Sequence, residues 1–224
     1  WVQIDNNSAG NVYGTGTDGA ITVTSSTNLN TTAIASGRTY ADGIAYKVDM
    51  TQAFSSRSVT TVDTPSGLTG GDEILLLNLQ GASGDTGSVG NYEFLTVAGI
   101  SGKVVSFNTN IKNNYAGTSA SNQKVVIQRV PQYTNVTLSG SGSLTASAWD
   151  ALATAPTGAA GYLTGIVAFR ATVTVSVASG TSIAVNGKGH RGGAAASGAG
   201  DFFSYQGESR TGTGSQARTA NDGA

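Results

Sequence analysis

Apolar and polar side chains alternate over short stretches along much of this chain, and turn-forming residues separate the stretches. Residues 133–193 show this most clearly, as short alternating runs broken by Ser and Gly that end in the glycine-rich segment 187–193. Alternation over four to eight residues is typical of a strand with one buried face. The pattern therefore predicts an all-β protein built from short strands.

One arrangement of apolar positions recurs three times. In this arrangement, two apolar residues are separated by one residue. Five residues later comes a second pair with the same separation, whose members are apolar or small. The three copies are Val136, Leu138, Leu144 and Ala146; Val175, Val177, Ile183 and Val185; and Ile21, Val23 and Leu29 with Thr31 in the last place. Each copy predicts one unit of strand, turn and strand.

Units of this kind lack the symmetry of a hairpin, and they bury their inward side chains best when each unit pairs with the next. The repeat favours a right-handed parallel β-helix. A β-sandwich of similar composition would show the same pattern and stays as the alternative. The sequence contains no amphipathic helix that could cap either end, so we expect exposed strand edges at both ends of the coil.

The region 58–130 has a denser apolar pattern. Residues 74–79 form an apolar run that follows Gly70 and Gly71 and predicts a fully buried strand. Residues 93–100 and 103–108 alternate around Ser101 and Gly102 and predict a hairpin, and 124–130 predicts a strand that Pro131 ends. We expect a small antiparallel barrel or sandwich inserted into the coil.

These patterns divide the chain into four parts. We expect first β-helix units in 1–57, the inserted antiparallel unit in 58–132, later β-helix units in 133–193, and a Gly/Ala/Ser-rich extension in 194–224. The extension has one apolar cluster, at 201–205, which is too little to form a core of its own.

Composition narrows the class of protein. Charged residues make up 11% of the 224 residues, less than half the usual share of about 25%, and the net charge is −1. The chain therefore lacks the basic surface that binds nucleic acid. It has no cysteine and no apolar segment that could span a membrane. Such Thr/Gly-rich chains are common among exported bacterial surface proteins, and we expect this one to be a mature or excised part of a longer protein.

Several segments resemble a class of large, glycine-rich bacterial surface or secreted proteins that carry a right-handed parallel β-helix module. The resemblance lies in residues 71–81, 89–94, 123–133, 144–149, 165–170 and 187–193, and it extends from about Gly14 to Gly193. It implies an extracellular β-helical module followed by a glycine-rich region, and it implies no established reaction. The alanines at 194–196 depart from the long glycine tract expected there.

Residues able to do chemistry are sparse. His190 is the one histidine, and without cysteine the sequence excludes Cys–His catalysis and multi-histidine metal sites. Asp72 and Glu73 are adjacent, so in a strand they would point to opposite faces and could not act together on one glycosidic bond. We expect these two residues to start the buried strand, and Asp18, Asp42 and Asp150 to cap turns.

Weaker signals fall in several places. Residues 5–10 resemble a calcium loop but lack its closing acid, and 14–19 lack the Lys-Ser/Thr of a phosphate loop. Glycosylation sequons occur at Asn6, Asn30 and Asn135, a number that chance explains in such a sequence. The aromatic residues Trp149, Tyr162, Phe202, Phe203 and Tyr205 could stack on sugars, but we expect them to cover an open end of the coil.

The sequence thus predicts a structural, non-catalytic module of an extracellular bacterial surface assembly, a filament subunit or adhesin stalk that acts by β-edge pairing and packing. We expect no catalytic, cofactor-binding or metal-binding residue. The expected partners are copies of itself or other surface proteins, and a polysaccharide is a further candidate partner. Two alternatives remain open, a carbohydrate-binding or carbohydrate-active β-helix and a phage tail-fibre or receptor-binding module.

Overall fold

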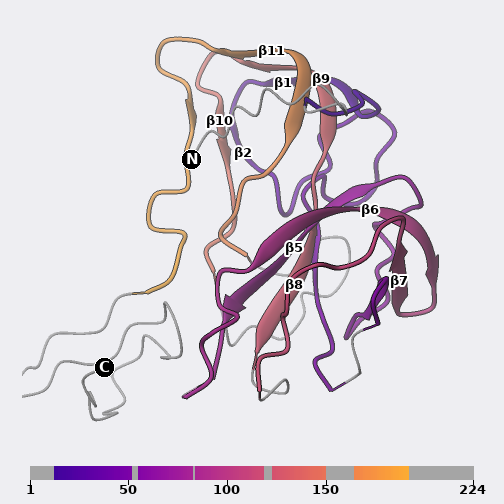
Figure 1. The fold of residues 1–224 in the computed structure, drawn as a ribbon. Helices are drawn as coiled ribbons and strands as arrows, with labels where there is room; N and C mark the ends of the chain where they lie inside the picture. The colour runs from indigo at the N-terminus through magenta and orange to yellow at the C-terminus, as the bar shows by residue number, and fades with distance from the viewer. Residues whose placement is uncertain (1–12, 52–54, 83, 119–122, 150–163, 192–224) are drawn as a thin grey trace, which may run out of the picture.

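The structure is a computed structural model, and it describes residues 13–51, 55–82, 84–118, 123–149 and 164–191 (Figure 1). Every helix or strand assigned in these ranges is a β-strand. The prediction of an all-β protein is therefore confirmed. The strands form two small parallel sheets and one larger, curled antiparallel sheet, which lies below the parallel part in Figure 1.

The parallel part consists of three stacked units of strand, turn and strand. The first strands of the units form one sheet in the order β1, β9, β11, and the second strands form another in the order β2, β10, β12. Their bounds are β1 Gly19–Val23, β2 Ser26–Asn28, β9 Gln132–Leu138, β10 Ser143–Thr145, β11 Arg170–Val177 and β12 Ser182–Ile183. The parallel pairing differs from the antiparallel sheets of a β-sandwich. Whether the units close into a right-handed β-helix stays a prediction.

Most of the repeat read from the sequence matches the pairing of the strands. Ile21 and Val175 both pair with Val136, Val23 and Val177 both pair with Leu138, and Leu144 pairs with Ile183. All of these positions therefore lie in the register that the repeat predicts.

The second half of the first copy is an exception. Thr27, not Leu29, pairs with Leu144, so the alignment of Leu29 with Leu144 and of Thr31 with Ala146 was wrong by two residues. The reason is turn length: two residues join β1 to β2, whereas four join β9 to β10 and β11 to β12. The longer turns contain Gly140 and Gly180, both at positive φ, where glycine is favoured.

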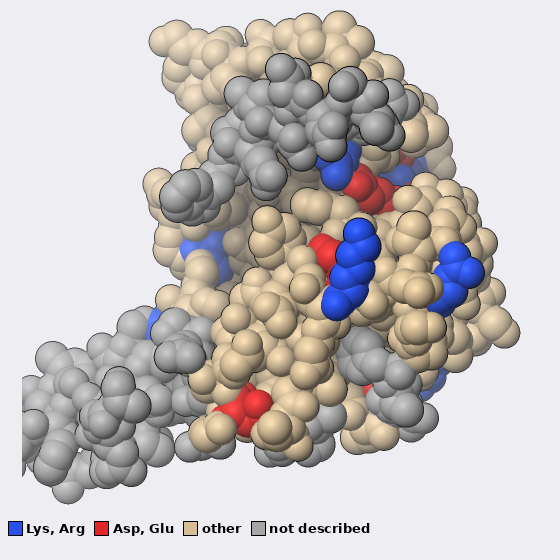
Figure 2. Space-filling model, in the orientation of Figure 1, with Lys and Arg blue, Asp and Glu red and all other residues tan. Residues whose placement is uncertain are grey.

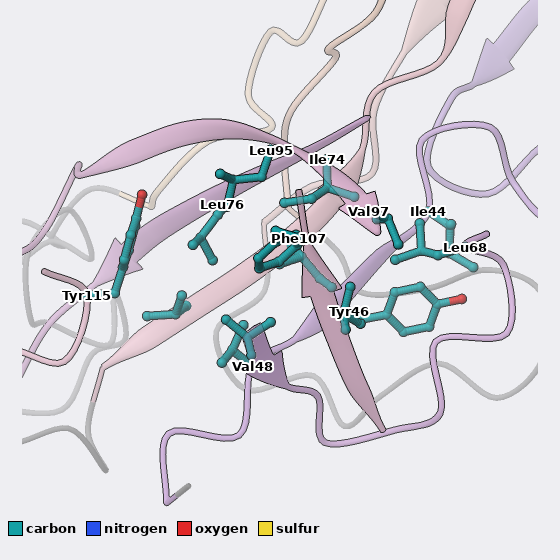
Figure 3. Packing of buried hydrophobic residues seen from close by; sticks show 14 of the residues in the cluster. Ile44, Tyr46, Val48, Leu68, Ile74, Leu76, Leu95, Val97, Phe107 and Tyr115 are labelled. Carbon is teal, nitrogen blue, oxygen red and sulfur yellow. The ribbon is translucent and has the colours of Figure 1, made fainter. Parts of the chain in front are cut away.

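The antiparallel sheet has six strands in the order β3, β8, β5, β6, β7, β4. Their bounds are β3 Ala45–Lys47, β4 Ser58–Thr60, β5 Glu73–Gln80, β6 Tyr92–Ser101, β7 Val104–Phe107 and β8 Lys124–Arg129. The sheet curls around the main hydrophobic core, which includes Ile74, Leu76, Val97 and Phe107 (Figure 3). A bridge between Val48 and Thr61 joins its two edges.

Two local predictions for this sheet are confirmed. The apolar run 74–79 lies in the central strand β5, where most side chains are buried. β6 and β7 form the predicted hairpin, although the two turn residues are Gly102 and Lys103, not Ser101 and Gly102, because Ser101 pairs with Val104. Gly102 has φ +58°, as the first turn residue of a type II′ hairpin requires.

The predicted division into four parts stays a prediction. β3 lies within 1–57 but pairs with β8 of the antiparallel sheet. The extension 194–224 lies outside the described residues.

Candidate functional site

β11 and β12 form the third parallel unit, and each is an edge strand of its parallel sheet (Figure 1). This unit differs from the other two in the exposure of its apolar side chains. Its inward positions are Val175, Val177 and Ile183, which are 45%, 48% and 39% exposed. Their register partners in the middle unit, Val136, Leu138 and Leu144, are all 0% exposed. The same apolar pattern is therefore buried in the middle unit and uncovered in the third.

We call this region the β11–β12 surface and define it by its five exposed apolar residues. They are Val173, Val175, Val177, Ile183 and Val185. Exposed apolar residues that gather on one structural unit can mark an interaction site. The surface therefore has the apolar character of an interface.

The backbone of β11 is also open to pairing. Among the described strands, β11 pairs with β9 on one side and with no strand on the other. Proteins usually protect such an edge with Lys, Pro or inward charges. The sequence from 171 to 187 contains neither a charged residue nor a proline. The surface thus offers an unprotected strand edge together with exposed apolar side chains.

The opposite end of the stack is covered. Ile21 and Val23 of β1 are buried, and Ile34 and Ala35 belong to the same hydrophobic cluster. The prediction of strand edges at both ends agrees with the pairing, since β1 and β2 each have a described neighbour on one side only, but the inward side chains of β1 are buried rather than exposed. No sequence pattern predicts this burial, because the segment between β2 and β3 that packs against β1 contains neither a helix nor an alternating pattern.

Asp42 holds this covering segment in place. Its carboxylate accepts hydrogen bonds from the backbone N–H groups of Ile34 and Ala35, at 3.1 and 3.0 Å. It also accepts a 2.5 Å hydrogen bond from the Tyr133 hydroxyl on β9. Burial raises the pKa of Tyr133, and the charge of Asp42 raises it further. The turn-capping role predicted for Asp42 is confirmed, and it fixes the covered end to the middle unit.

An ion pair fixes the start of β11. Arg170 donates to both carboxylate oxygens of Glu73, from Nε at 2.6 Å and from Nη2 at 2.7 Å. The hydrogen bonds to Glu73 raise the pKa of Arg170 although burial opposes this. The guanidinium also lies 4.9 Å from the centre of the Phe94 ring. These contacts tie β11 to the antiparallel sheet and position the uncovered edge.

A second charged group joins the two parts of the molecule in the interior. Arg129, at the end of β8, donates to Asp72 from Nε at 2.7 Å and to Asp18 from Nη2 at 2.7 Å, and all three side chains are buried. Burial disfavours the charged guanidinium, but the two aspartates outweigh it and raise the pKa of Arg129. On the face drawn in Figure 2, charged side chains lie in small separate groups on a mostly uncharged surface.

No family model and no curated protein matches the chain. Among solved structures, the chain matches phage tailspike proteins at TM-scores too low to carry an argument about fold or function. They include gp49 from Pseudomonas phage LKA1 (TM-score 0.25, 14% identity), gp54 of Acinetobacter baumannii bacteriophage AP22 in complex with capsular saccharide (0.28, 16%) and gp61 from Pseudomonas phage phi297 (0.24, 14%). The matches cover 50%, 57% and 63% of this chain but 21%, 22% and 19% of those chains. The chain thus spans about a fifth of each tailspike's length.

The acidic residues considered in the sequence lie in separate places. Asp72 binds Arg129 and the backbone of Thr69, whereas Glu73 binds Arg170 and Gln132. They do not face one another, as the alternation of a strand predicts. No group of three or more His, Asp or Glu side chains in the described residues could hold a metal ion.

His190 lies against the antiparallel sheet. Its Nε2 is 3.0 Å from the carbonyl oxygen of Leu79, and its ring centre is 5.5 Å from that of Trp149. These contacts hold the His190 ring beside Leu79 and Trp149, and its role as a polar turn residue stays a prediction.

The predicted glycosylation sequons, the calcium-like segment and Asp150 lie partly inside and partly outside the described residues. Asn30 is buried and donates to the carbonyl oxygens of Gly43 and Ile166, so the folded chain could not be glycosylated there. Asn135 is half-buried. The calcium-like segment 5–10, Asn6 and Asp150 lie outside the described residues.

The aromatic residues are arranged differently from the expectation. Trp149 is buried with Leu79 and Val126 on the outer face of the antiparallel sheet, not at the end of the stack. Tyr162, Phe202, Phe203 and Tyr205 lie outside the described residues. The exposed pair is Tyr92 and Phe94 on β6, whose ring centres are 6.3 Å apart. The alternation from 92 to 97 could have revealed this pair, since it places both rings on the face opposite Leu95 and Val97.

No helix within the described part of the chain is long and apolar enough to cross a membrane.

Proposed function

We propose that the chain is a non-catalytic assembly module of an extracellular bacterial surface structure and that copies of it associate through the β11–β12 surface. In this proposal the three parallel units are successive turns of a right-handed β-helix, and the third turn is left open for a further β-layer. The partner supplies that layer.

The observation that carries the proposal is the difference in burial between register partners. Val175 and Val177 occupy the positions of Val136 and Leu138, yet they are about half exposed, whereas Val136 and Leu138 are fully buried. Burying the exposed part of one such side chain contributes on the order of 1 kcal/mol. Several such side chains, together with the backbone edge of β11 that pairs with no described strand, would offset part of the free-energy cost of association.

Composition and charge support the non-catalytic, extracellular part of the proposal. The chain has no cysteine and few charges. The buried acidic residues Asp18, Asp42 and Asp72 are held by Arg129 or by backbone donors. Groups bound in this way stabilise the fold and are not free to transfer protons.

The test is the mass in solution across a range of protein concentrations, measured by light scattering. We expect the natural chain to associate and Val177→Lys to remain monomeric, because a lysine on the β11–β12 surface would be buried against the partner. Val104→Lys is the matched control, since Val104 is also an exposed valine on a strand but lies on β7. A natural chain that is monomeric at every concentration would refute the proposal.

A second candidate function is binding of a polysaccharide, which the exposed Tyr92 and Phe94 rings favour because aromatic faces stack on sugar rings. Titration of the chain with a panel of bacterial polysaccharides tests it. Binding that the Y92A/F94A variant loses would support this function, and absence of binding by the natural chain would exclude it for that panel.

A further inference from the structure

We propose that two copies join open end to open end, with β11 of one copy paired antiparallel to β11 of the other about a two-fold axis at Val175. This inference rests on the proposed function and specifies its partner and symmetry. Both β11–β12 surfaces are then covered in one step, and assembly stops at a dimer.

The β1 end disfavours head-to-tail growth because its inward apolar side chains are already buried. A filament of stacked copies would require the open end of one copy to dock on the opposite end of the next. Ile21 and Val23 offer such a copy no exposed apolar surface, because they are buried and the segment packed against them is tied to Asp42 and Tyr133, although β1 itself has a described neighbour on one side only. The surface left for a second copy is the partner's own β11–β12 surface, and this gives a symmetric contact.

Residues 192–224, which follow the third unit, lack the side chains for a fourth unit of the same design. The first strand of each parallel unit carries two Val, Ile or Leu residues at paired inward positions. The sequence from 192 to 224 contains no Val, Ile or Leu. A second copy, in contrast, carries the complete set of apolar side chains in β11 and β12.

The side chains fix the register of the pairing. In an antiparallel pair, directly opposed residues lie on the same face, so valines must oppose valines if they are to share a core. An axis at Val175 places Val175 opposite its own copy and Val177 opposite the partner's Val173. The paired segment 173–177 then lies wholly within β11, and only its first residue, Val173, falls inside the register irregularity between Ala171 and Thr174. An axis at Ser176 would carry part of the pairing into the turn after β11.

Because the chain has no cysteine, single cysteine variants can test this register. Opposed residues in an antiparallel pair have Cα atoms roughly 4.5–5.5 Å apart, within the range of a disulfide. We expect Val175→Cys to give a disulfide-linked dimer under mild oxidation. Val177→Cys is the matched control, since its two copies would lie about 14 Å apart along the strands and should not cross-link. The V173C/V177C double variant should cross-link again.

The outcomes separate this inference from the proposed function. A mass of two copies together with cross-linking of V175C and not of V177C supports it. Association into trimers or into species that grow with concentration, or equal cross-linking of V177C, overturns the two-fold pairing and leaves self-association standing. A natural chain that is monomeric at every concentration overturns both.

Discussion

At the scale of single residues, Tyr133 shows how much of this structure depends on a few buried polar contacts. The side chain is fully buried, and its hydroxyl donates to Asp42, which also holds the segment that covers β1. The hydroxyl therefore stabilises the closed end of the stack only while it carries its proton.

This gives a prediction for alkaline pH. Burial and the charge of Asp42 raise the pKa of Tyr133 above its ordinary value near 10. A group whose pKa is raised by folding contributes stability below its unfolded pKa and loses it as the pH rises. We therefore expect the free energy of unfolding to fall above about pH 10, by up to about 1.4 kcal/mol per pH unit for this residue.

Urea unfolding of the natural chain and of Tyr133→Phe, measured from pH 8 to pH 11, checks this expectation. The variant should be less stable by about 1–2 kcal/mol at pH 8, since Asp42 loses a donor, and should show a shallower decline above pH 10. Tyr92→Phe, at an exposed tyrosine, is the control. Equal slopes for the natural chain and Tyr133→Phe would contradict the role given to Tyr133.

At the scale of elements, the parallel units share one side-chain pattern but not one environment. Val136 and Val175 are register partners on neighbouring strands. β9 is covered on both sides by β1 and β11, whereas β11 has a described neighbour on one side. The stability that a valine contributes should therefore depend on the strand that carries it.

We predict that Val136→Ala lowers the free energy of unfolding by roughly 2 kcal/mol, because it leaves a cavity in the core. Val175→Ala should change it by less than about 0.5 kcal/mol at protein concentrations low enough to keep the chain monomeric. Urea unfolding of the two variants side by side provides the measurement. A loss at Val175 as large as that at Val136 would mean that β11 is already covered within a single chain.

The pattern of these elements was largely predictable. The repeat placed Ile21, Val136 and Val175 in register because inward positions in stacked strands must be apolar. The shift at Leu29 was not predictable, because turn length decides which residues pair and a two-residue turn carries no signal in the apolar pattern. The Arg170–Glu73 pair could not be foreseen either, since its residues are 97 positions apart.

At the scale of the whole molecule, Arg129 links the antiparallel sheet to the stack of parallel units. It ends β8 of the antiparallel sheet and binds Asp18, the residue before β1 of the parallel stack, as well as Asp72 before β5. A buried arginine between two buried carboxylates makes each charge depend on the other two.

We predict that Arg129→Met lowers the free energy of unfolding by about 3–5 kcal/mol, because it leaves two buried carboxylates without their cation. The triple variant D18N/D72N/R129M should recover part of this loss, since no unpaired charge remains. Denaturant unfolding followed by fluorescence and by circular dichroism measures both. A loss below about 1 kcal/mol for R129M would show that the two parts do not depend on this link.

The sequence by itself determined the class of this protein. Alternating apolar residues and Gly-containing turns specify strands locally, because this pattern depends only on near neighbours along the chain, and the recurrence of the same inward positions indicates which units stack although they lie far apart in the sequence. Which end of the stack is covered and which is open was decided by tertiary structure. Burial depends on segments distant in sequence, such as the loop held by Asp42, and no pattern within β1 or β11 records whether another layer lies upon it.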